Sequence, residues 1–573
     1  MKIWKKVVAA MTAGMLCLGS VGLSGVENVL KSVGTVLSAS AEETAETERV
    51  PVGTGTTTVR VGTGMTQLEY EVYNDDTVGI TNCDNDAAGE LEIPAEIDGK
   101  PVTSIGDGAF SVCSGLTKIT IPNGVTSIGD YAFSDCSGLT EITIPNGVTS
   151  IRDGAFSNCS GLTEITIPDS VTSIGDNAFS DCSGLTEITI PDSVTSIGDE
   201  AFHNCSGLTE ITIPDSVTSI GNRTFSLCSS LTEITIPDSI TSIGYRAFSD
   251  CDSLTEITIP DSVTSIGSSA FSFCDSLTEI TIPDSVTSIG SYAFEETPWL
   301  TAKQAKDPLV IVNHILIDGK TCTGAVSIPN GVTSIGDSAF VCCSSLTEIT
   351  IPDSVTSIGD GAFSSCSSLT EITIPDSVTS IGYSAFFCCA SLTNITIPDS
   401  VTSIGDSAFY CCDSLTNITI PDSVTSIGDY AFYDCTNLTI YGYTGSYAET
   451  YAKENDIPFV SLGNITTTET TTTTIETTVT TTTETMVTTK TTTTTTKQDS
   501  ETPTVIYGDI TLDGRVDITD AVLLNKFCSG AVILNDAAKL NSDCDGDGDI
   551  TGNDAVALLQ FLVQIVQKLP YTA

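Results

Sequence analysis

LTEITIPDSVTSIGYSAFFCCAS, residues 369–391, is the clearest copy of a 23-residue unit that recurs from Pro101 to about Tyr441. Its first six residues are rich in β-branched side chains, and Ile-Thr-Ile alternates, so we expect a strand with one buried face. Proline ends this strand, Asp-Ser forms a turn, and Val-Thr-Ser-Ile makes a second extended segment. Glycine then opens a bend, and Ala-Phe lies in a short helical or 3₁₀ turn. The fixed period predicts a mainly β solenoid, because coils that cannot cover their own apolar faces must stack.

A single column of cysteines follows the same period. It runs from Cys113 to Cys274 in steps of 23 residues and continues in phase from Cys343 to Cys435. Cysteine is among the most buried residue types, and parallel side chains do not converge as a disulfide requires. We therefore interpret the column as buried free thiols, with a ladder of disulfides as the alternative. The interpretation leaves open the doublets that begin at Cys342, Cys388 and Cys411.

Charge and composition exclude several kinds of function. The 573 residues contain 73 Asp and Glu against 21 Lys and Arg, a formal net charge of −52. Such an acidic surface repels nucleic-acid phosphates and anionic lipid, so we expect no nucleic-acid partner and no membrane insertion. His203 and His314 are the only histidines, and no isolated acid pair or Ser/His/Asp set stands out. We therefore expect no catalytic residues and no enzyme activity.

The sequence also predicts where the protein is located. Lys2, Lys5 and Lys6 precede an apolar stretch from Val7 to Leu23, and Ala39-Ser40-Ala41 has the form of a cleavage site. These features predict a signal peptide over residues 1–41 and a secreted mature chain.

Composition divides the remaining sequence into five parts. We expect an N-terminal segment with a capping hairpin at 42–100, the repeat array at 101–441 with irregular coils at 295–331, and a C-terminal cap at 442–464. A threonine-rich stretch at 465–504 cannot build a core and is predicted to be an extended linker. The last part, 505–573, carries a different pattern that is described below.

The repeat resembles the BspA-type leucine-rich repeats of bacterial surface and secreted proteins. The shared pattern is L-x-x-I-x-I-P-x-x-V-x-x-I-G-x-x-A-F-x-x-C, and it covers about 340 residues of this chain. The resemblance implies a leucine-rich repeat solenoid that serves adhesion or protein binding. It does not specify a ligand.

Two surfaces of the array could contact a ligand. The outward strand positions form a nearly uniform lattice of threonine and glutamate, which we interpret as a solvated face. Variation is concentrated just before Ala-Phe, and it includes Tyr and Arg, the residue types that are enriched in interfaces. Drift after duplication is the alternative explanation. The varied positions are Tyr131, Asn177, Glu200, Arg223, Tyr245, Arg246, Tyr292, Tyr383 and Tyr430.

The end of the chain contains two loops with the spacing of EF-hand calcium sites. Each has twelve residues, glycine at position six and an acid at position twelve, and calcium takes six to eight oxygen ligands. We therefore predict two Ca²⁺ sites. The first would use Asp509, Thr511, Asp513, the Arg515 carbonyl, Asp517 and Asp520, and the second Asp543, Asp545, Asp547, the Asp549 carbonyl, Thr551 and Asp554.

The last 65 or so residues resemble a type I dockerin, a small all-α module with two such loops. The resemblance implies calcium-dependent docking to a cohesin module of a scaffoldin in a cellulosome. The family's recognition positions are here Ile518-Thr519 and Gly552-Asn553. Because these pairs differ, we expect one binding orientation to dominate.

Together, the two resemblances predict a non-catalytic, secreted component that docks on a scaffoldin at the cell surface and presents the repeats to a protein or carbohydrate. One alternative is an adhesin for host, plant or neighbouring-cell surfaces. Another is an accessory to polysaccharide catabolism that binds polysaccharide directly.

Overall fold

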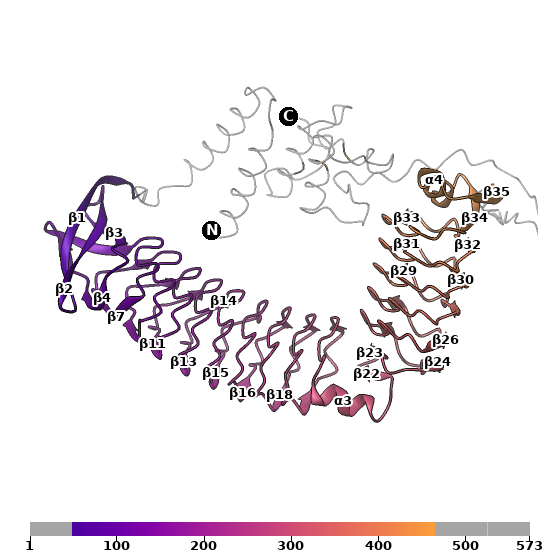
Figure 1. The fold of residues 1–573 in the computed structure, drawn as a ribbon, viewed down its shortest axis with the longest axis horizontal. Helices are drawn as coiled ribbons and strands as arrows, with labels where there is room; N and C mark the ends of the chain where they lie inside the picture. Colours follow the sequence, from indigo (N-terminus) through magenta and orange to yellow (C-terminus); the bar gives the residue numbers. More distant parts are fainter. Residues whose placement is uncertain (1–48, 465–523, 525–541, 543–557, 559–573) are drawn as a thin grey trace, which may run out of the picture. The chain divides into compact units, whose positions relative to one another are not determined.

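The computed structural model describes residues 49–464 together with Leu524, Ser542 and Leu558. Within that part the fold is a β-solenoid of 23-residue coils, which confirms the predicted class (Figure 1). The predicted signal peptide, linker, calcium loops and cohesin-binding pairs lie outside the described residues.

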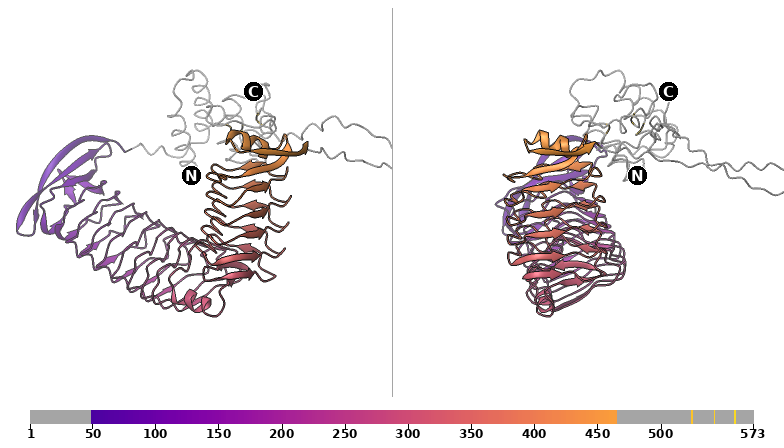
Figure 2. Two further views of the ribbon diagram at one scale, coloured as in Figure 1. Left: turned by 45° about the vertical axis from the view of Figure 1, so that its right-hand side comes forward. Right: turned by 90° about the vertical axis from the view of Figure 1, so that its right-hand side faces the viewer.

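Most coils contribute a longer and a shorter strand, each paired in parallel with its copies in neighbouring coils, and at Ile220 an isolated bridge to Ile243 takes the place of the shorter strand. Copies of the same residue pair in register, for example Glu141 with Glu164 and Ser150 with Ser173. Figure 2 shows the coils as successive layers. We call the coils with buried phenylalanines from Phe110 to Phe294 the first run, and those from Phe340 to Phe432 the second run.

The longer strands of the first run are β4 (Ala88–Glu92), β7 (Gly115–Thr120), β9 (Glu141–Thr143), β11 (Glu164–Thr166), β13 (Glu187–Thr189), β15 (Glu210–Thr212), β16 (Glu233–Thr235), β18 (Glu256–Thr258) and β20 (Glu279–Thr281). Those of the second run are β24 (Gly324–Ser327), β26 (Leu346–Thr350), β28 (Glu371–Thr373), β30 (Asn394–Thr396) and β32 (Asn417–Thr419). The shorter strands are β8 (Ser127–Ile128), β10 (Ser150–Ile151), β12 (Ser173–Ile174), β14 (Ser196–Ile197), β17 (Ser242–Ile243), β19 (Ser265–Ile266), β21 (Ser288–Ile289), β25 (Ser334–Ile335), β27 (Ser357–Ile358), β29 (Ser380–Ile381), β31 (Ser403–Ile404) and β33 (Ser426–Ile427).

The core is a set of columns in which each side chain packs on its own copies in the next coils. The phenylalanine rings stack along each run, with centroids 5.4 Å apart between Phe133 and Phe156 and 5.3 Å apart between Phe363 and Phe386. The cysteine column is buried and free, as predicted. The Cys159 thiol donates to the Phe133 carbonyl at 3.1 Å, and the same bond recurs along the column. The thiols therefore satisfy backbone carbonyls and do not cross-link.

The segment around Ala-Phe is a series of turns, not the short helical or 3₁₀ turn that the sequence suggested. Two columns in these turns have a left-handed backbone. One precedes Ala-Phe directly, with φ of 56° at Tyr131, and the other precedes the core cysteine, with φ of 60° at Asp135. The left-handed residues turn the chain sharply without a helical segment. This conformation costs an L-residue about 1–2 kcal/mol.

The N-terminal end is covered by a small β-structure. The predicted hairpin is present as β2 (Gly64–Tyr73) and β3 (Val78–Cys83), and β3 pairs in parallel with β6 (Lys100–Ile105). β1 (Pro51–Val61), a Gly/Thr-rich strand that pairs with β2, was not predicted from the sequence. The short β5 (Glu96–Ile97) pairs with β6.

A helix separates the two runs, where the sequence suggested only irregular coils. α3 (Pro298–Gln304) begins after Thr297, whose hydroxyl accepts a hydrogen bond from the Leu300 amide. Beyond it, β22 (Val310–Val312) and β23 (Ile315–Asp318) form a hairpin. The strand ladders end at β20 and β21, and new sheets start at β24 and β22. The two runs therefore have separate hydrogen-bonded sheets.

The second run ends in a cap. β34 (Thr439–Thr444) continues the longer ladder and pairs with β35 (Phe459–Asn464). α4 (Tyr447–Glu454) lies between them, begins at Ser446, and buries Ala448, Tyr451 and Ala452. In residues 49–464, no helix is long and apolar enough to cross a membrane.

Candidate functional site

The strand face is a regular polar surface whose hydroxyls are largely used by the fold. Thr140 donates its hydroxyl to the Thr117 carbonyl of the preceding coil at 3.0 Å, and this bond recurs from coil to coil. The glutamates stay exposed, and Lys118 forms an ion pair with Glu141 at 2.8 Å. These contacts account for the uniform threonine column without a ligand.

Seven of the nine varied positions are Tyr or Arg; these predicted contact residues, which we call the ligand ridge, lie on the turns and fall into two columns. Tyr131, Arg223, Arg246, Tyr292 and Tyr430 occupy the left-handed position directly before Ala-Phe, or before Thr-Phe in one coil. Tyr245 and Tyr383 lie one residue earlier, in a column that is mostly aspartate. There the Asp360 carboxylate accepts the Tyr383 amide at 2.7 Å, and other coils repeat this bond. In the second column, the aspartate side chain therefore accepts a hydrogen bond from a backbone amide of the next coil. Tyr245 and Tyr383 have no carboxylate and cannot pass this bond on to the coil that follows.

The middle of the ridge is engaged in contacts within the protein. The Arg223 guanidinium pairs with Glu200 at 2.9 Å and lies 5.4 Å from the Tyr245 ring centroid. Arg246 lies 5.2 Å from the same ring. Tyr131 packs over Gly154, where an added Cβ would come within 2.3 Å of its ring. Among the ridge tyrosines, Tyr430 and Tyr383 remain the most exposed, at 62 % and 56 %.

Sequence reasoning missed a second set of aromatic residues on the last coils. Phe387, Tyr410 and Tyr433 directly follow the core phenylalanines, and we call them the aromatic ladder. Their ring centroids lie 4.9 Å and 5.3 Å apart, with nearly parallel planes. Most coils of the first run have serine at this position. A comparison of the residue that directly follows Ala-Phe in every repeat would have revealed this change from serine to aromatic residues.

The exposure of the ladder is uneven: Phe387 and Tyr410 are half-buried, and Tyr433 is exposed. Because the rings stack on one another, the shared faces are covered and are not free to receive a sugar ring. Tyr433 is 55 % exposed, and Tyr430 meets it edge to face at 5.7 Å. Tyrosine edges and hydroxyls provide contact area at low entropic cost, as in protein interfaces. The most exposed aromatic cluster in the second run therefore suits a protein partner.

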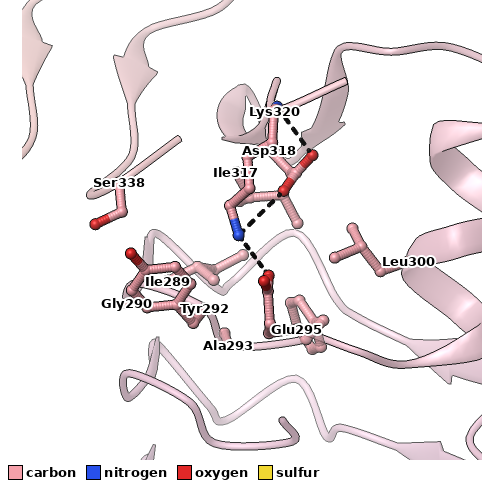
Figure 3. A pocket seen from close by; sticks show the side chains of 11 residues that line it. Ile289, Gly290, Tyr292, Ala293, Glu295, Leu300, Ile317, Asp318, Lys320 and Ser338 are labelled. Carbon is pink, nitrogen blue, oxygen red and sulfur yellow. Dashed lines mark hydrogen bonds and ion pairs between the residues drawn. The ribbon is translucent and has the colours of Figure 1, made fainter. Parts of the chain in front are cut away.

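The junction of the two runs contains a small cavity of about 10 Å³ beside Lys320. Figure 3 shows the Lys320 ammonium between Glu295 and Asp318, which both pair with it. The ammonium also lies 4.5 Å from the Tyr292 ring centroid, and burial raises the pKa of the Asp318 carboxyl. A space of this size holds no more than about one water. This cluster is a partly buried group of ion pairs between the last coil of the first run and the segment after α3, not a ligand pocket.

Trp299 has a structural role at the end of the first run. It is 7 % exposed and packs against Phe294, with ring centroids 4.8 Å apart. An open hollow of about 200 Å³ lies beside it, lined also by Glu279, Lys303 and Lys306. Trp299 is therefore a core residue that covers the last coil of the first run.

The predicted calcium ligands can be judged by their chemistry alone, because they lie outside the described residues. The two loops supply carboxylates, threonine hydroxyls and two backbone carbonyls, all hard oxygen donors. This set fits Ca²⁺ in type and number. Within the described part of the chain, no group of three or more His, Cys, Asp or Glu residues could hold a metal ion.

Comparison with known proteins identifies both parts of the chain. Residues 90–208, 195–313 and 319–439 match the BspA type leucine rich repeat region, and residues 507–563 match the dockerin type I domain. A leucine-rich repeat protein from Bacteroides ovatus is 32 % identical, with 65 % of this chain and 98 % of that one covered and a TM-score of 0.40. A leucine rich cell surface protein from Faecalibacterium prausnitzii is 35 % identical, with coverages of 69 % and 97 % and a TM-score of 0.37. No curated protein matches.

The chain belongs to the BspA type leucine rich repeat family. It also carries a type I dockerin domain, which implies docking to a cohesin, and type I dockerins bind calcium. The repeats imply a protein-binding surface. Both are non-catalytic modules, and proteins that carry dockerins are generally extracellular.

Proposed function

We propose that this chain is a non-catalytic, secreted component that its dockerin holds on a cohesin-bearing scaffoldin, while the repeat array contacts a protein partner. The observation that carries the proposal is the presence in one chain of a long repeat array and a dockerin. A tether and an interaction surface are the two parts that such a component needs.

Calcium fixes the two dockerin loops when it is bound, because it neutralises carboxylates that otherwise repel one another. The residues that would hold it are the loop oxygens named above, from Asp509 to Asp520 and from Asp543 to Asp554. Ile518-Thr519 and Gly552-Asn553 would then contact the cohesin. Because the two pairs differ in side-chain size and polarity, one of the two orientations is favoured.

Binding to an immobilised type I cohesin tests the tether. The full chain binds in calcium and is released by a chelator, and replacement of Asp513 and Asp547 by Ala abolishes binding. The matched control replaces the array residues Asp376 and Asp399 by Ala and leaves binding unchanged. Binding that persists in chelator would contradict the proposal. Exchanging one recognition pair for the other tests orientation, and equal effects of the two exchanges would refute a dominant orientation.

The aromatic ladder and Tyr430 support a protein ligand over a polysaccharide. Open aromatic faces are the usual means of holding sugar rings, and the longer strands from β9 to β20 are Glu-Ile-Thr with no aromatic residue. The ladder has aromatic rings, but its shared faces are covered by stacking. Tyrosine edges with nearby polar groups are the chemistry of protein contacts.

A further inference from the structure

The exposed members of the cysteine doublets form a column of their own. Cys342, Cys388 and Cys411 directly precede the core cysteines and have a left-handed backbone, with φ of 58°, 55° and 54°. Cys342 is exposed, and Cys388 and Cys411 are half-buried, whereas their neighbours Cys343, Cys389 and Cys412 are buried. Solvent can therefore reach these thiols, in contrast to the core column.

We propose that Cys388 and Cys411, which occupy the same half-buried position on adjacent coils, are a site of oxidation that closes a disulfide between the two coils. The backbone places them side by side, because the Cys388 amide donates to the Tyr410 carbonyl, next to Cys411, at 2.7 Å. Stacked strands lie about 4.8 Å apart, which falls within the Cα separations of about 4.4–6.8 Å that disulfides span.

Neighbouring side chains keep the two coils in register. Phe387 and Tyr410 directly precede the two cysteines, and their rings stack with centroids 4.9 Å apart. Core cysteines on the same coils are engaged elsewhere, since the Cys412 thiol donates to the Phe386 carbonyl at 3.2 Å. The Cys388 and Cys411 side chains are half-buried and are not held in the core, so, unlike the buried thiols of the core column, they can rotate toward each other as a disulfide requires.

The side chains around Cys411 influence which of the two thiols reacts first. Its thiol donates to the Asp434 carboxylate at 3.5 Å. Burial, this hydrogen bond and the adjacent Cys388 raise the pKa of Cys411 to about 11. The hydrogen bond to the Asp434 carboxylate favours the protonated form of the Cys411 thiol, and we therefore expect Cys388 to attack first. The thiolate is the nucleophile in thiol–disulfide exchange.

The oxidant is a small disulfide such as oxidised glutathione. The Cys388 thiolate attacks one of its sulfurs, forms a mixed disulfide and expels a glutathione thiolate. The Cys411 sulfur then attacks the Cys388 sulfur, expels the second glutathione, and its proton passes through Asp434 to solvent. Two protein thiols are oxidised and one glutathione disulfide is reduced.

Cys342 provides a control within the chain. It lies two coils before Cys388, with Ser365 at the intervening position. Two steps of about 4.8 Å exceed the span of about 7 Å beyond which a disulfide needs backbone movement. Cys342 therefore forms only a mixed disulfide.

Peptide mapping by mass spectrometry, after the reduced full chain is treated with oxidised glutathione under native conditions, tests the site. We expect a Cys388–Cys411 cross-link that has lost two hydrogens, a glutathione adduct on Cys342, and unmodified core cysteines, which also report that the chain is folded. In Cys411→Ser, Cys388 should keep glutathione as a stable adduct. Glutathione on both Cys388 and Cys411, no reaction at either, or a cross-link through Cys342 would overturn the proposal.

Discussion

The coils before α3 and the coils after it have separate cores that are packed in the same way, and they differ on one surface. Stacked phenylalanines and thiol-to-carbonyl bonds run through both runs with nearly the same spacing. The position after the core phenylalanine, in contrast, changes from serine to Phe387, Tyr410 and Tyr433 in the last coils. Interior residues are constrained because each contacts its own copies, whereas packing does not require the aromatic ladder. The difference separates what the fold needs from what a partner would contact.

Alkaline pH should unfold both runs alike. Burial raises the pKa of Cys228 and Cys389 from 9.0 to about 12, so the unfolded chain loses these protons first. The thiol contribution to stability is complete below about pH 9 and is lost as pH rises toward 12, by up to about 1.4 kcal/mol per thiol per pH unit. Urea unfolding at pH 8 and pH 10.5 in a reducing agent measures the loss. Cys228→Ala and Cys389→Ala should each flatten the pH dependence, and an unchanged slope in either would show that the thiols do not set it.

Deleting one ring of the phenylalanine stack should cost about the same in each run. Phe156→Ala and Phe386→Ala each leave a cavity in a tightly packed column, and the expected loss is about 3–5 kcal/mol. Urea unfolding followed by circular dichroism checks both. Tyr410→Ser, which restores the residue usual in the first run, should cost far less. A loss in one run only would show that the two cores are not equivalent.

Thr224 is a local exception within the first run. It replaces the alanine before the core phenylalanine, is 1 % exposed, and its hydroxyl has no hydrogen-bond partner in the described structure. Thr224→Ala should therefore stabilise the chain by about 1 kcal/mol, because it removes an unsatisfied buried group. Thermal unfolding checks the sign, and Thr218→Ala on the same coil serves as an exposed control. A lower melting temperature for Thr224→Ala would contradict the assignment.

Substitutions in the left-handed column directly before Ala-Phe are expected to change the free energy of unfolding least. Ser407 has φ of 55°, and Gly361 holds the same position two coils earlier with φ of 60°. Ser407→Gly should stabilise by about 0.5–1 kcal/mol, and Gly361→Ser should destabilise by a similar amount. Opposite shifts in the urea midpoint are expected. Shifts of the same sign would mean that backbone strain does not govern this column.

The sequence predicts the interior of this chain much better than its surface. Strand positions and core columns follow from the 23-residue period, because a repeated contact leaves a repeated residue type. The left-handed turns do not, because Tyr131, Arg223 and Cys388 occupy positions that usually select glycine or asparagine. α3 and β1 lie where the repeat lapses or has not begun, so no period marks them. The aromatic ladder was visible in the sequence, but only when each column is compared along the whole array.

Retention of a protein by the cohesin-anchored full chain tests most directly whether the aromatic ladder is the contact surface. One variant carries Phe387→Ser, Tyr410→Ser and Tyr433→Ser, and its matched control carries Glu141→Gln, Glu164→Gln and Glu187→Gln on the strand face. From the same culture supernatant, the parent chain and the strand-face variant should retain the same defined protein, and the ladder variant should retain at least about tenfold less, as expected for loss of an interface hot spot. Equal retention by the ladder variant, or a loss confined to the strand-face variant, would contradict the account.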